Sequence, residues 1–160
     1  MANTDVTLDD ARKSLLSNQA RAASGFTHKW TIKYTDIDEG SGSSDTVTVS
    51  LGHTYADFVI TKAMINVTTA FAGTGALVVE VGTDGDPNNF ITSITVMTAG
   101  PTISAVGGAP VTLAGTFAVA SDALEALFTN SSSGSPSALT AGEMDIYLCM
   151  VNANDVGYPV

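Results

Sequence analysis

The sequence has few of the residues that chemistry at an active site requires. Of its 160 residues one is cysteine, Cys149, and two are histidine, His28 and His53. A single cysteine excludes a disulfide within the chain and a zinc site built from cysteines. Two histidines so far apart in sequence are too few for a histidine-rich metal site. We therefore expect no enzymatic activity, no catalytic residues and no cofactor.

Basic residues are also scarce, and none follows Lys62. The formal net charge is −10, with six basic residues against sixteen acidic ones. Phosphate backbones and anionic lipid surfaces bind lysine and arginine, so this balance argues against nucleic acid and membrane as partners. The sequence opens on MANTDVTLDDARK, which lacks the apolar run of a signal peptide. These features predict a soluble protein made in a cytosol.

The chain is rich in alternating apolar and polar residues from position 26 onward. Segments such as KWTIKY, TVTVSL, ALVVEVG, FITSITVM, PVTLAGTFAV, DALEALFTN and EMDIYLCMV are separated by clusters of Gly, Pro, Asn, Asp and Ser. A period of two indicates strands with one buried face, and the short spacing of the turns predicts an antiparallel sandwich or barrel. DALEALF could also form one helical turn. We expect LTAGEMDIYLCMV to be an interior strand, with Glu143 and Asp145 at its solvent end.

A different pattern occupies residues 7–24. Thr7, followed by Asp10, resembles a capping box, and apolar residues recur at helical spacing until Gly25. We predict an N-terminal helix that either packs on its own domain as a lid or docks on another chain as an arm. The predicted organisation is a helical arm over residues 1–25, a β-domain over 26–151 and a tail over 152–160.

One loop carries a candidate metal site. TDGDPNN places Asp84, Asp86 and Asn88 at alternate positions, as at the start of a calcium loop. The pattern then fails, because Asn89 stands where a glycine is needed and Thr95 where a bidentate glutamate is needed. We interpret the segment as a β-hairpin turn, and calcium binding as the alternative.

Three stretches carry a resemblance to a known class of proteins. They are FTHKWTIKYTD, the segment VTTAF to VGTDGDPNNFIT, and LTAGEMDIYL, at residues 26–36, 67–92 and 139–148. They resemble small β-sandwich structural proteins of tailed bacteriophages, mainly capsid decoration or cement proteins. The resemblance covers about half of the chain and has no catalytic residues to transfer.

The resemblance implies an all-β, antiparallel β-sandwich with a jelly-roll-like path, located on the exterior of the virion capsid after synthesis in the host cytoplasm. It implies two partners: the major capsid protein and further copies of the chain, with a trimer favoured over a dimer. A tail-fibre or receptor-binding module that recognises carbohydrate is the alternative. The arm holds three of the six basic residues. We expect it to contact the capsid through Leu8, Ala11, Arg12, Lys13, Leu15, Leu16 and Arg21.

Overall fold

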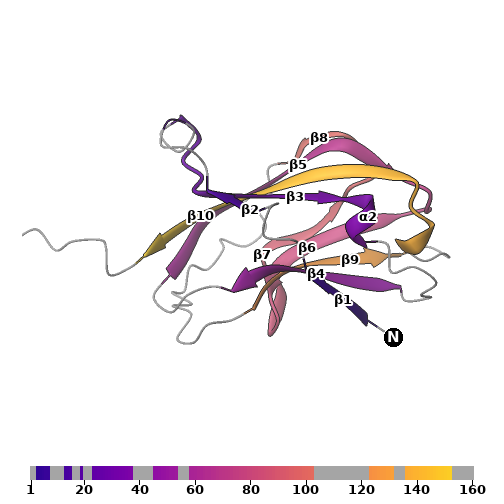
Figure 1. Ribbon diagram of the computed structural model, residues 1–160, viewed down its shortest axis with the longest axis horizontal. Coiled ribbons are helices and arrows are strands. Elements are labelled where there is room, and N and C mark those ends of the chain that lie inside the picture. The colour runs from indigo at the N-terminus through magenta and orange to yellow at the C-terminus, as the bar shows by residue number, and fades with distance from the viewer. Residues whose placement is uncertain are drawn as a thin grey trace, which may run out of the picture.

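The computed structural model describes residues 3–7, 13–15, 19, 23–37, 45–53, 58–102, 123–131 and 136–152 (Figure 1). Most of the described residues are in strands. The elements follow in the order β1 (Asn3–Thr7), β2 (Lys13–Leu15), β3 (His28–Lys33), α2 (Tyr34–Ile37), β4 (Thr46–His53), β5 (Phe58–Ala72), β6 (Leu77–Thr83), β7 (Asp86–Thr95), β8 (Gly100–Thr102), β9 (Ala123–Asn130), the 3₁₀ helix η2 (Pro136–Ala138) and β10 (Ala141–Asn152).

The strands form two sheets of five. Sheet A has the order β1-β4-β9-β6-β7, and sheet B has the order β2-β3-β10-β5-β8. Figure 1 shows sheet B as the upper layer and sheet A as the lower one. Among the described pairings, all are antiparallel except that between β1 and β4. The predicted all-β, mainly antiparallel fold is therefore confirmed.

The two sheets share one hydrophobic core. Alternate residues of the strands that form it face this core, as in β9, where Leu124, Ala126 and Phe128 are buried and the residues between them are half-buried. The ring of Phe128 meets that of Phe71 on β5, with centroids 6.2 Å apart. The indole Nε1 of Trp30 on β3 donates a hydrogen bond of 2.9 Å to a β4 backbone carbonyl. These contacts join the sheets face to face.

The predicted interior strand is confirmed as β10, which lies between β3 and β5 at the centre of sheet B. Met144, Ile146 and Leu148 are fully buried in the core. The segment 123–130 is the strand β9, so its helical alternative is wrong. The strand predicted over residues 110–119 lies outside the described residues, as does the tail from residue 153 onward.

The predicted N-terminal helix is wrong for Lys13–Leu15, which form the strand β2 and pair with His28–Trp30 of β3. Asn3–Thr7, just before it, form β1 and pair with β4. The apolar stripe that suggested a helix was narrow, and edge strands offer unpaired backbone groups that a neighbouring segment can satisfy. Pairing with these edges therefore prevails over helical propensity. Further along, Gln19, Ala23 and Ser24 are helical.

The glycine near the start of β10 lets this strand pass close to β5. Gly142 has φ of 142°, and a Cβ there would overlap the ring of Phe71. The ladder between β10 and β5 shifts register on both sides of Glu143, as at a β-bulge. Gly142 is therefore required both by its backbone conformation and by the aromatic ring beside it.

We expect Gly142→Ala to lower the free energy of unfolding by about 3 kcal/mol or more, because it adds overpacking to backbone strain. Gly100→Ala is the matched control. Gly100 has nearly the same φ, 139°, but no atom within 4 Å of a Cβ at that position. Urea denaturation of both variants separates the cost of backbone strain from the cost of overlap with the Phe71 ring. Equal losses of unfolding free energy in the two variants would contradict the role given to Phe71.

Candidate functional site

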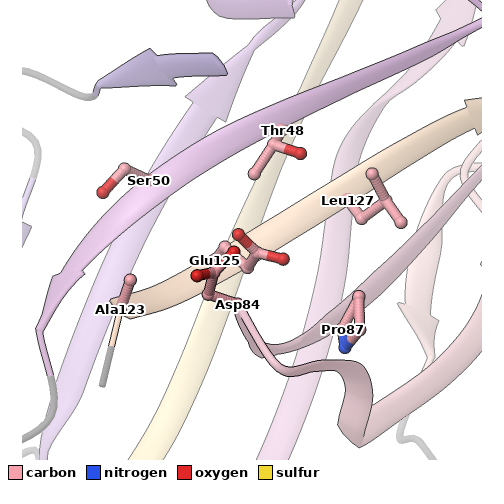
Figure 2. Close-up of a pocket in the computed structure, with 7 residues that line it drawn as sticks. All are labelled: Thr48, Ser50, Asp84, Pro87, Ala123, Glu125 and Leu127. Atoms are coloured by element: carbon pink, nitrogen blue, oxygen red, sulfur yellow. The ribbon is translucent and has the colours of Figure 1, made fainter. Parts of the chain in front are cut away.

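Polar side chains gather on the outer faces of the two sheets, because the inner faces form the core. The outer face of sheet A contains a hollow of about 360 Å³ (Figure 2). Its walls come from β4, from β9, from the turn between β6 and β7 and from the start of β7. The lining residues are Thr48, Ser50, Asp84, Pro87, Ala123, Glu125 and Leu127.

Strand alternation and one turn build this hollow. Because Leu124, Ala126 and Phe128 face the core, Ala123, Glu125 and Leu127 point outward. The backbone N–H of Asp84 donates a 3.1 Å hydrogen bond to the carbonyl of Ala123, which fixes the turn against the start of β9. At Gly82, a Cβ would overlap the backbone of Asp86 and Pro87, so glycine permits the close approach of β7.

The hollow combines two carboxylates with two hydroxyl groups and three apolar side chains. Asp84 and Glu125 direct their carboxylates toward the same space, beside Thr48 on the neighbouring strand (Figure 2). Carboxylates accept hydrogen bonds from ammonium, guanidinium or hydroxyl donors, and apolar walls can cover the carbon stem of such a group. The hollow is thus suited to a cationic side chain or a polyhydroxylated ligand.

The candidate calcium residues lie in the hairpin formed by β6 and β7. Asp84 and Gly85 are the two-residue turn of a hairpin, Thr83 pairs with Asp86, and β7 continues through Asn88. This confirms the hairpin interpretation. Asp84 lines the hollow with Glu125, whereas Asp86 and Asn88 are not among its lining residues. Within the described ranges, no group of three or more His, Cys, Asp or Glu side chains could hold a metal ion.

A second polar cluster lies on the outer face of sheet B, around Asp145. This aspartate was predicted at the solvent end of its strand, but it is 5% exposed, so that prediction is wrong. Lys29 Nζ lies 2.9 Å from Asp145 Oδ2, the Thr31 hydroxyl donates to Oδ1 at 2.7 Å, and the Tyr147 hydroxyl donates to Oδ2 at 3.2 Å. Three donors from two adjacent strands compensate for the loss of solvent around the carboxylate.

The cluster changes the proton affinity of its members. Burial lowers the pKa of Lys29, but the hydrogen bond and charge of Asp145 outweigh burial, so that pKa lies above its ordinary value of 10.5. Burial and the charge of Asp145 raise the pKa of Tyr147 above 10.0. Both groups therefore hold their protons more firmly than they would in water.

The same face continues on both sides of the cluster. Toward one end, Lys62 Nζ lies 4.4 Å from the centroid of the Phe26 ring and donates a hydrogen bond of 3.0 Å to the Ser24 carbonyl. Toward the other, Lys33 lies 3.7 Å from Glu143, and its side chain is 52% exposed. Two lysines are thus exposed at the ends of a face whose centre is a buried ion pair.

The predicted capsid-contact residues are described only in part. Lys13 and Leu15 lie in β2, with the backbone alone described, while Leu8, Ala11, Arg12, Leu16 and Arg21 lie outside the described residues. The sequence did not predict that Asp84 and Glu125 line one hollow or that Thr31 donates a hydrogen bond to Asp145. Such pairs depend on strand order, which one sequence does not reveal.

No family model, curated protein or solved structure matches this chain. Among the described residues, no helix is both long enough and apolar enough to cross a membrane.

Replacing Asp145 with alanine should lower the free energy of unfolding by about 2 to 3 kcal/mol, as measured by urea denaturation. The change leaves Lys29, Thr31 and the Tyr147 hydroxyl without their shared acceptor. Lys29 is 30% exposed and can recover some hydration, which places the loss below that of a fully buried pair.

Glu143→Ala is the control for this substitution, since Glu143 lies on the same strand and face with a longer and more exposed lysine contact. We expect it to cost less than about 1 kcal/mol. A loss as large as that of Asp145→Ala would mean that the buried cluster contributes nothing specific.

Stability should also fall in alkali. Since the folded pKa values of Lys29 and Tyr147 are raised, their stabilisation is complete below about pH 10 and is lost as pH rises through the raised values. Urea midpoints at about pH 9 and about pH 11 test this. Tyr147→Phe should reduce the loss of stability between these two pH values, whereas Tyr34→Phe, outside the cluster, should not. An equal alkaline loss in the two variants would refute the contribution of Tyr147.

Proposed function

We propose that this protein is a non-enzymatic virion component of a tailed bacteriophage, a capsid decoration protein that binds the major capsid protein on the shell exterior as a homo-oligomer, favouring a trimer. The observation that carries the proposal is the strand order. The eight strands from β3 to β10 can be numbered 1 to 8 along the chain. Their order across the sheet is then 1-8-3-6 in sheet B and 2-7-4-5 in sheet A.

This order supports a β-sandwich with jelly-roll topology, an architecture used by viral capsid and lectin domains. β1 and β2 are then additions, one at an edge of each sheet. The stretches that resemble phage proteins coincide with β3, β10, the end of β5 and the β6–β7 hairpin. These elements include the three central strands of sheet B, so the resemblance concerns the framework of the fold.

Charge also supports the proposal. A net charge of −10 keeps copies soluble before assembly and disfavours contact with the packaged nucleic acid. A decoration protein requires a stable framework and a docking surface, and no catalytic group.

A receptor-binding module that recognises carbohydrate is the second candidate, and the hollow on sheet A favours it. Carboxylates and hydroxyl groups can bind sugar hydroxyls, and jelly rolls include lectin domains. Among the described residues that line this hollow none is aromatic, however, and aromatic side chains offer apolar faces on which sugars can stack. We therefore place the capsid role first.

The capsid role is tested by co-sedimentation with heads assembled without this protein. Removing the N-terminal residues would also strip β1 and β2 from the sheet edges, so substitutions are preferable to truncation. We expect saturable binding by the unaltered chain. Arg12→Gln combined with Arg21→Gln should weaken it by about tenfold, because these residues belong to the predicted capsid contact.

Thr92→Glu combined with Ser93→Glu is the matched control. It lowers the net charge by the same two units, at exposed positions of β7. Equal weakening in both variants would indicate a general charge effect and would refute the N-terminal contact. Absence of binding by the folded chain would refute the capsid role and leave the carbohydrate module as the leading function, to be tested on a glycan array.

A further inference from the structure

Charge is divided unequally between the two sheets. The strands of sheet B contain all four lysines of the chain and two acidic residues: Lys13, Lys29, Lys33, Lys62, Glu143 and Asp145. The strands of sheet A contain four acidic residues and neither lysine nor arginine: Asp5, Glu80, Asp86 and Glu125. Asp84 adds a further carboxylate in the β6–β7 turn. The strands of sheet B therefore contain more basic than acidic residues, although the net charge of the chain is −10.

Among the charged residues of the two sheets whose side chains are described, the charges point away from the core. Trp30 and Ile32 are buried, so the residues that alternate with them on β3, Lys29 and Lys33 among them, lie on the outer face of sheet B. On sheet A the buried Val79 and Val81 flank Glu80, which consequently points outward. The outer face of sheet A is therefore acidic. On the outer face of sheet B the described lysines, Lys29, Lys33 and Lys62, outnumber the carboxylates of Asp145 and Glu143, with which two of them pair.

Each face also has a feature that fits the other. Sheet A has the hollow in which Asp84 and Glu125 converge beside hydroxyl groups and the apolar Leu127. Sheet B has Lys33, whose side chain is 52% exposed and whose Nζ lies 3.7 Å from Oε2 of Glu143, beyond hydrogen-bond distance. The carboxylate of Asp36 accepts a hydrogen bond of 2.7 Å from the backbone N–H of Lys33. A lysine can extend its charged end into such a hollow while its carbon stem covers apolar surface.

We infer that the outer face of sheet B of one copy docks on the outer face of sheet A of a second copy, with Lys33 entering the hollow formed by Asp84 and Glu125. The inference specifies the contact by which the proposed homo-oligomer forms, and it therefore rests on that part of the proposed function. Charge complementarity selects a second copy as the occupant, because the same chain carries both faces.

Such a contact is heterologous, since each copy uses two different faces. A pair of docked copies still has one uncovered sheet A face and one uncovered sheet B face. Further copies can add at these faces, so that the assembly either closes into a ring or grows into a filament. A closed ring of three copies is the form compatible with the proposed trimer. The carboxylates in the hollow would then be covered by the neighbouring copy.

The test is the oligomeric mass of the purified full chain, measured by sedimentation velocity without capsids. Assembly should weaken by about tenfold or more between about 0.1 M and about 1 M salt, because the Debye length falls from about 10 Å to about 3 Å. Lys33→Glu and Glu125→Lys should each abolish assembly at the lower salt concentration. The double variant, with the net charge of the original chain, should restore it.

Asp45→Lys is the control, because Asp45 is exposed, is not among the residues lining the hollow, and its substitution changes the net charge as Glu125→Lys does. It should assemble normally. If Glu125→Lys unfolds, Asp84→Asn combined with Glu125→Gln tests the same contact. A monomer at low salt, assembly insensitive to salt, or failure of the double variant to assemble would overturn the inference. Because no capsid is present, none of these results bears on capsid binding, which the head co-sedimentation tests separately.

Discussion

The structure depends on the burial of alternate side chains from two facing sheets in one apolar core. Every strand that contributes to this core has a second face that must point outward, because successive residues of a strand alternate. The hydrogen bond from Trp30 to the backbone of β4 and the contact between Phe71 and Phe128 fix the two layers against each other. Both candidate sites are consequences of this arrangement, since each lies on an outer face.

The two outer faces solve different physical problems. On sheet B, Asp145 lies in the central strand, where solvent is largely excluded, so its charge requires Lys29, Thr31 and Tyr147 as partners. On sheet A, Asp84 and Glu125 line an open hollow at the surface of the protein. The first arrangement is a compact set of contacts within one sheet that stabilises it, whereas the second is a concave surface with room for a group from outside. This difference motivates the docking inferred between copies.

Much of the framework could be predicted from local sequence. The two-residue period marked β3, β4, β6, β9 and β10, and the Asp-Gly pair marked the β6–β7 turn. The N-terminal prediction failed at β2 because a narrow apolar stripe was taken for a helix. The available edge of β3 decided that segment instead. Sequence reasoning also placed Asp145 in solvent, since a charged residue between apolar ones gives no sign of its cross-strand neighbours.

The sequence by itself determined the class of fold, the β6–β7 hairpin turn and the scarcity of basic residues, because these follow from composition and from contacts between near neighbours. The tertiary structure alone decided the strand order, the place of β10 at the centre of sheet B and the partners of each outward side chain. Thr31 meets Asp145 across 114 positions of the chain, and Glu125 and Asp84 line the same hollow for the same reason. Pairing between distant strands is set by how both sheets bury their apolar faces together, which no local pattern specifies.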